Sequence, residues 1–216
     1  MEEKDNFRHK GLRKKLIESL RAKGIREENV LEAMDRVPRH LFMDSSFLNF
    51  SYTDKAFPIA AGQTISQPYT VAFQTELLNV EKHCKILEVG TGSGYQTAVL
   101  LELGARVYTV ERQRELFLAA QKTLGSLKYK PLFFYGDGYE GLPAYAPFDR
   151  ILLTAAAPET PQTLLEQLAE GGIMVLPEGD RFGQKMIRIV RKTDGIYDRS
   201  EHGHFSFVPL LRGKNQ

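Results

Sequence analysis

The sequence has little of several features that mark common protein classes. Only one of its 216 residues is a cysteine, Cys84, so an internal disulfide and a cysteine-rich metal site are excluded, and a reducing compartment suits the chain. No run of about 18 apolar residues occurs, and the opening residues, MEEKDNFRHK, lack the apolar stretch of a secretory signal. We therefore expect a soluble, cytoplasmic protein without a membrane partner.

An excess of charge of one sign is also missing. The chain has 29 Lys and Arg against 27 Asp and Glu, so no overall field attracts nucleic acid or anionic membranes. The exception is a basic run near the N-terminus that contains Lys10, Arg13, Lys14, Lys15, Arg21 and Lys23. A solvated helix face is the commoner explanation of such a run, and we expect no nucleic-acid partner.

Closely spaced metal ligands are absent as well. Of the five histidines, His202 and His204 are close in sequence, but no Cys, Glu or further His stands near them at ligand spacing. This pair is more typical of residues that flank a turn. We expect no metal.

The hydrophobic pattern predicts an α/β fold with a helical arm. LRKKLIESLRAKGI and ENVLEAMDRV have apolar residues at helical spacing. From Lys85 onward β-rich and helical runs alternate, which indicates βαβ units on a parallel sheet: KILEV, YQTAVLLELG, RVYTV, RELFLAAQKTLG, PLFFY, FDRILLT, PQTLLEQLAEGG and IMVLPE. KMIRIVRK and FSFVPLL alternate more and predict closing antiparallel strands. We expect one domain, with an arm over 1–50, a loop and helix over 51–80 and a doubly wound core over 81–216.

The strongest chemical signal is LEVGTGSG, residues 87–94, where a predicted strand ends in a glycine-rich turn before a helix. Ligands of doubly wound sheets bind at such strand ends. Gly90 and Gly92 permit a tight turn and close approach of a ligand, and Gly94 permits close packing of helix and strand. The loop therefore predicts a cofactor site.

The loop favours an adenosyl cofactor over a dinucleotide. Tyr95 stands where the G-x-G-x-x-G pattern of dinucleotide folds has its third glycine. Glu88 suits a cationic ligand and is poorly placed beside a pyrophosphate. S-adenosylmethionine, which has a sulfonium, an ammonium and no phosphate, fits. The cofactor contacts predicted at this loop are Glu88, Gly90, Thr91, Gly92 and Ser93.

Two further acids follow the next predicted strands. Glu111 comes directly after RVYTV, where nucleotide-binding sheets place a carboxylate on ribose hydroxyls; the alternative is an exposed acid paired with Arg112 or Arg114. Asp137 could accept from an adenine amino group while Gly138 lets the ring approach; the alternative is an ordinary Asp-Gly turn. Taken in order with the glycine loop, these acids favour the adenosyl cofactor.

An uncharged stretch, GQTISQP at residues 62–68, precedes the glycine loop and leads into PYTVAFQTELL, a predicted helix that begins at Pro68. On local sequence alone, the commoner role would be capping of that helix by Gln67 or Ser66.

In wider context the chain resembles the protein-L-isoaspartate O-methyltransferase family. The resemblance runs from about Val37 to the C-terminus, through RVPRHLF, FPIAAGQTISQP, LEVGTGSGYQ, VYTVER, GDG, FDRILLTAAAP and FVPL. Phe57 and Ala60 depart from the leucine and glycine usual in the family. Neither departure removes a polar group from the site.

The resemblance implies an S-adenosylmethionine-dependent (Rossmann-like) methyltransferase fold, S-adenosylhomocysteine as product and damaged proteins as substrates. The sequence does not give the oligomeric state, and we expect a monomer. The free α-carboxyl of an isoaspartyl residue would be methylated, and the ester would close to a succinimide whose hydrolysis returns some normal linkages. By the same resemblance Ser66 faces the methyl donor and the incoming carboxyl. Gln63, Thr64 and Ile65 line the same cleft.

Two other functions stay open on the sequence. A methyltransferase acting on RNA or a small molecule would share the cofactor half, with the basic arm as its only hint. A non-catalytic module that binds the adenosyl cofactor would use Ser66 only as a helix cap.

Overall fold

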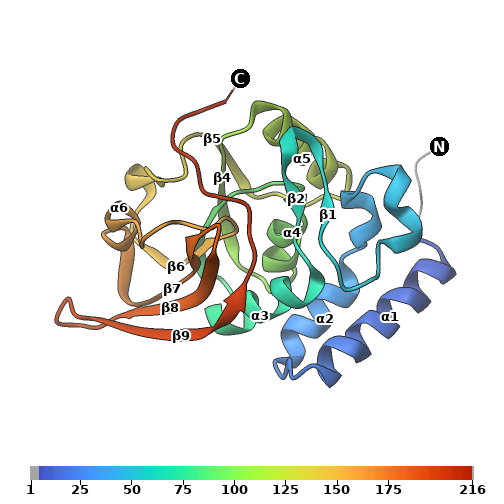
Figure 1. Cartoon of the computed structure of the whole chain (residues 1–216), viewed down its shortest axis with the longest axis horizontal. Coiled ribbons are helices and arrows are strands. Elements are labelled where there is room, and N and C mark those ends of the chain that lie inside the picture. The colour runs from blue at the N-terminus through green and yellow to red at the C-terminus, as the bar shows by residue number, and fades with distance from the viewer. Residues whose placement is uncertain (1–4, 216) are drawn as a thin grey trace.

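The computed structural model describes residues 5–215, and its centre is a seven-stranded sheet (Figure 1). The strand order is β5-β4-β3-β6-β7-β8-β9, and a separate two-stranded ribbon pairs β1 with β2. The strands are β1 (Phe57–Pro58), β2 (Thr64–Ile65), β3 (Lys85–Val89), β4 (Arg106–Glu111), β5 (Leu132–Tyr135), β6 (Phe148–Leu153), β7 (Leu168–Asp180), β8 (Gly183–Arg191) and β9 (Tyr197–Phe205). The helices are α1 (Phe7–Ala22), α2 (Glu28–Arg36), α3 (Pro68–Leu78), α4 (Tyr95–Glu102), α5 (Arg114–Ser126) and α6 (Gln162–Leu165).

The five strands from β5 to β7 run parallel, and β8 and β9 close the sheet in antiparallel fashion. The central strands are buried on both faces because helices cover each side, as their continuous apolar runs predict. The doubly wound, mostly parallel α/β fold expected from the sequence is confirmed. No helix within residues 5–215 has the length and apolar character needed to cross a membrane.

The N-terminal arm consists of α1 and α2, which lie side by side and pack on α3 and α4 (Figure 1). Leu20 and Met34 from the arm share one apolar cluster with Tyr95 and Val99 of α4. Three of the six residues of the basic run form ion pairs with described residues: Arg13 with Asp5, Arg21 with Glu28 and Lys23 with Asp54. Half of the basic run is therefore paired locally.

One predicted helix is largely wrong. The stretch PQTLLEQLAEGG forms only the four-residue helix α6, and β7 already begins at Leu168. Phe148 of β6 pairs with Leu168 before the register shifts. This pairing holds the residues from Leu168 onward in an extended strand, although their local hydrophobic pattern favours a helix. The predicted strand IMVLPE lies within β7.

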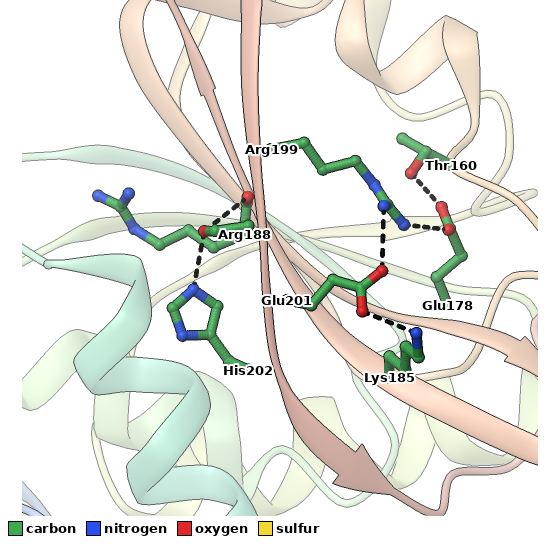
Figure 2. Close-up of polar contacts among 8 residues, drawn as sticks. Thr160, Glu178, Lys185, Arg188, Arg199, Glu201 and His202 are labelled. Carbon is green, nitrogen blue, oxygen red and sulfur yellow. Dashed lines mark hydrogen bonds and ion pairs between the residues drawn. The ribbon is translucent and has the colours of Figure 1, made fainter.

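The last strand also differs from the prediction. FSFVPLL, residues 205–211, begins with the final residue of β9 and otherwise lies outside the named strands; the strand beside β8 is Tyr197–Phe205. β9 is an edge strand with mostly exposed side chains. Its Glu201 forms an ion pair with Lys185 of the adjacent β8, and its Arg199 forms one with Glu178 of β7 (Figure 2). Such an edge shows no apolar alternation in the sequence.

Candidate active site

A cavity opens at the carboxyl ends of β3, β4 and β6, where the strand order reverses direction. This is the place at which doubly wound sheets bind ligands. Most of the residues predicted from the sequence line it: Gln63, Thr64, Ile65, Ser66, Gly90, Thr91, Gly92, Ser93, Glu111 and Gly138. Two predicted residues, Glu88 and Asp137, are not among those that line it.

The glycine loop passes so close to its neighbours that side chains would not fit. Gly90 has φ 95°, and a Cβ there would lie 2.5 Å from the hydroxyl oxygen of Thr154. That hydroxyl donates to the carbonyl oxygen of Gly90 at 2.5 Å, which fixes the loop against the end of β6. A Cβ on Gly94 would lie 2.9 Å from Leu124 of α5, so Gly94 permits helix–helix contact rather than the helix–strand contact we expected.

Glu111 ends β4 with its carboxylate at the cavity and only 5% of its surface exposed. One carboxylate oxygen accepts from the backbone N–H of Gly92 at 2.9 Å, and the other accepts from that of Gln113 at 2.8 Å. The strand-end acid is therefore locked beside the glycine loop. Neither Arg112 nor Arg114, the partners in the alternative interpretation, forms an ion pair with it among the described residues.

Glu88 points into the protein beneath the loop and is fully buried. One of its oxygens accepts from the hydroxyls of Thr97 at 2.5 Å and Thr109 at 2.7 Å, while the other, Oε1, has no partner among the described residues. Burial raises the pKa of Glu88 to about 7, although the two hydroxyls act in the opposite direction. Glu88 thus supports the floor of the site rather than lining the cavity.

Asp137 is occupied by backbone contacts. Its carboxylate accepts from the N–H groups of Tyr139 at 2.9 Å and Gly213 at 2.6 Å, which ties the C-terminal segment over the end of the sheet. Gly138 lines the cavity, and a Cβ there would lie 2.5 Å from Val89. Asp137 therefore holds the chain around the cavity, and an adenine contact for it stays a prediction.

A second cavity adjoins the first and shares four of its residues, Thr64, Ser66, Thr154 and Val208. Its outer wall includes His202 and His204 of β9. Ser200 holds the His202 ring through a 2.8 Å contact between Oγ and Nε2 (Figure 2). Ser66 therefore lies where the two cavities meet.

The start of α3 is capped without Ser66. The N-cap residue is Gln67, and its side chain makes no capping hydrogen bond. Instead, the backbone N–H of Tyr69 donates to the carboxylate of Asp54 at 2.7 Å. The helix begins at Pro68 as predicted, but the capping interpretation of Gln67 and Ser66 finds no support in these contacts.

Several lining residues were missed by the sequence reasoning. They are Gln96, Gln113, Leu116, Thr154, Val208 and Leu210. The backbone of Ala156 pairs with Val208 and Leu210 at 2.8 and 2.7 Å, so TAAAP and FVPL are adjacent in space. Both stretches are among the motifs that carry the family resemblance, and this was the signal in the sequence that could have identified these lining residues.

The reversal point of the sheet, the G-x-G-x-G loop and the strand-end carboxylate together define the class of S-adenosylmethionine-dependent methyltransferases. The sequence model of the protein-L-isoaspartate (D-aspartate) O-methyltransferase family matches residues 11–215. The chain belongs to this family.

Individual relatives agree with the family assignment. The protein-L-isoaspartate O-methyltransferase of Christiangramia forsetii is 56% identical over 98% of this chain and 100% of its own. A solved protein-L-isoaspartate O-methyltransferase superposes with a TM-score of 0.83 at 28% identity, covering 91% of this chain and 65% of that one. A Plasmodium falciparum protein described as belonging to the same family, solved in complex with S-adenosyl-L-homocysteine, gives a TM-score of 0.80 at 26% identity over 92% of this chain and 97% of its own.

The residues present fit an adenosyl cofactor. Gly90 and Gly92, which line the cavity, would contact the methionine end, and the Glu111 carboxylate would accept from ribose hydroxyls. Val89 and Gly138, which border each other, would leave room for a flat ring. Tyr95, which is buried at the start of α4, stands where a dinucleotide fold has its third glycine.

Proposed function

We propose that this chain methylates the free α-carboxyl of isoaspartyl residues in damaged proteins, using S-adenosylmethionine, and so begins their repair. The family match over residues 11–215 supports the activity. The observation that carries the site assignment is the junction of two cavities at Thr64, Ser66, Thr154 and Val208. One cavity has the features of a cofactor site, and the other would admit the acceptor carboxyl.

Methyl transfer to a carboxylate depends mainly on how the enzyme positions the methyl donor and the carboxylate. The bound cofactor supplies a methyl group that is already activated by its sulfonium, and a carboxylate is ionised at pH 7 and needs no general base. Ser66 would donate a hydrogen bond that aligns the carboxylate with the methyl group. Gln63, Thr64 and Ile65 would shape the same wall, because the pairing of β1 with β2 holds this stretch at the junction.

The decisive experiment follows initial rates of methyl transfer from labelled S-adenosylmethionine to an isoaspartyl peptide, the matched aspartyl peptide and RNA in parallel. Ester on the isoaspartyl peptide alone is expected. Transfer to RNA would favour the alternative that rests on the basic arm, and cofactor binding without transfer to any acceptor would leave a non-catalytic binding module.

Replacement of Ser66 by alanine tests the proposed positioning role. Because one hydrogen bond to a charged group is lost, turnover should fall roughly tenfold to a hundredfold, while S-adenosylhomocysteine affinity changes less. Ser126→Ala is the matched control, since Ser126 is exposed and its hydroxyl donates to Thr123 at the end of α5. A Ser66→Ala protein with a lowered melting temperature and full turnover would show that the serine is only structural.

We also propose the assembly state and organisation expected from the sequence: a cytoplasmic monomer with one domain, divided into an arm over 1–50, a loop and helix over 51–80 and a core over 81–216. The shared apolar cluster of arm and core supports one folding unit. Light scattering on the purified chain tests the monomer, and a single calorimetric transition tests the single unit. Neither a membrane nor a nucleic acid enters the proposed reaction.

A further inference from the structure

Away from both cavities, the arm brings together three side chains of the types that bind transition metals. Asp5 precedes the N-cap of α1, His9 lies in its first turn, and His40 comes from the short 3-10 helix at Arg39–Phe42. One ligand atom from each lies within 4.8 Å of the others. The two imidazole rings are tilted by 32° to each other, with their centroids 3.8 Å apart.

The histidine nitrogens in this cluster lack partners. His9 is 8% and His40 is 1% exposed, yet Nδ1 of His9 and Nε2 of His40 form no hydrogen bond with the described residues. Buried polar nitrogens are rarely left in this way unless something else binds them. These two adjacent nitrogens are therefore available to a bound ligand.

The hydrogen bonding of the His40 ring suits such a ligand. Nδ1 of His40 lies 2.7 Å from the Tyr52 hydroxyl oxygen, which also accepts from Arg13 at 3.0 Å. With Nδ1–H donating to Tyr52, Nε2 carries the lone pair, which is the arrangement usual for metal-binding histidines.

The charged groups around the cluster are two carboxylates and two cations. Both carboxylate oxygens of Asp5 accept from Arg13 at 3.0 Å, and Arg13 also lies 3.6 Å from Asp35, which can keep the guanidinium paired when Asp5 binds an ion. The positive charge of Lys10 acts on Asp5 from the exposed side of the helix. Asp5 keeps a quarter of its side chain exposed and gives the cluster a route to solvent.

We propose that Asp5, His9 and His40 bind a zinc ion that fastens the start of α1 to the segment containing His40. Two imidazole nitrogens and one carboxylate oxygen form a ligand set that suits Zn²⁺ and neighbouring first-row ions, and water completes it in many zinc sites. Nothing in the methyl-transfer chemistry requires this ion. The site therefore stabilises the arm and is separate from catalysis.

The test uses the full chain stripped of metal with a chelator and then titrated with ZnCl₂, with Kd measured by competition against a chromophoric chelator. One equivalent should bind, and at a free concentration one hundred times Kd the melting temperature should rise by about 5 to 10 °C. Co²⁺ should give the visible absorption bands of a site with nitrogen ligands, and MgCl₂ should leave the melting temperature unchanged.

Variants separate this site from adventitious binding. His9→Gln and, independently, Asp5→Asn should weaken Zn²⁺ binding at least about tenfold, while methyl transfer continues at the wild-type rate. The matched control is the double variant His202→Gln and His204→Gln, which removes a half-buried and an exposed histidine from β9 and should bind Zn²⁺ like the wild type. Absence of saturable binding, unchanged Kd in both arm variants, or loss of binding in the control would each overturn the proposal.

Discussion

Replacement of Glu88 by glutamine should change how stability depends on pH. In the folded protein this carboxyl is fully buried, Oε1 has no hydrogen-bond partner among residues 5–215, and burial raises its pKa from 4.5 to about 7. Between these two values the folded state binds more protons than the unfolded state, so the contribution of Glu88 to stability is lost as the pH rises from 4.5 to 7. Glutamine keeps an oxygen for the hydroxyls of Thr97 and Thr109 but cannot ionise.

The size of this effect follows from the change in pKa, which is 7 − 4.5 = 2.5. At about 1.4 kcal/mol per pH unit, ionised Glu88 lowers the stability of the folded state at pH 8 by on the order of 3 kcal/mol. Relative to wild type, Glu88→Gln should therefore gain roughly that much stability between pH 4.5 and pH 8.

Urea unfolding of both proteins, without cofactor, at half-unit steps of pH measures this difference. Comparison of the two proteins also removes the opposite contribution of His40, whose lowered pKa makes stability fall as the pH drops from 6.5 toward 4. If the stability difference between variant and wild type is the same at pH 4.5 and pH 8, the assignment of a charged, dehydrated Glu88 is wrong.

Three further substitutions probe the site and its supports. Glu111→Ala should weaken S-adenosylhomocysteine binding by about 1.5 to 3 kcal/mol in calorimetry, because the ribose acceptor is lost; unchanged affinity in a folded variant would falsify the ribose assignment. Asp137→Ala frees the N–H of Gly213 and should also lower affinity for S-adenosylhomocysteine, and equal affinity would reduce Asp137 to an ordinary turn residue. Asp54→Ala removes the cap of α3 together with the ion pair to Lys23, so it should cost about 1 kcal/mol more in urea unfolding than Lys23→Ala, a difference that would be missing if Ser66 were the cap.

The local pattern of the sequence determined the parallel core and the position of the cofactor cavity. Apolar runs such as KILEV and RVYTV become buried strands because a strand covered by helices on both faces must be apolar throughout. Gly90 and Gly92 follow the end of one strand, and Glu111 ends the next strand. The sequence predicts that these residues lie close together because carboxyl ends of parallel strands share one edge of the sheet. These inferences depend on short-range spacing, which the chain carries by itself.

Which way a buried side chain points was decided only by tertiary packing. Glu88 stands one residue from Val89, which lines the cavity, yet strand alternation turns Glu88 to the opposite face with Ile86 and toward Thr97. In a strand buried on both sides, the sequence shows no polar face from which to read this direction. The capping of α3 by Asp54, 15 residues away from Tyr69, was likewise invisible in local spacing.

Long-range contacts account for the rest. β9 forms because β8 offers an unpaired edge, and its exposed residues need no apolar alternation to pair there. His9 and His40 are 31 positions apart in the sequence and meet because α1 packs against the chain that follows α2. A sequence fixes residue types and local periodicity, whereas the meeting of distant polar side chains depends on how apolar faces pack, and that is settled only when the whole core forms.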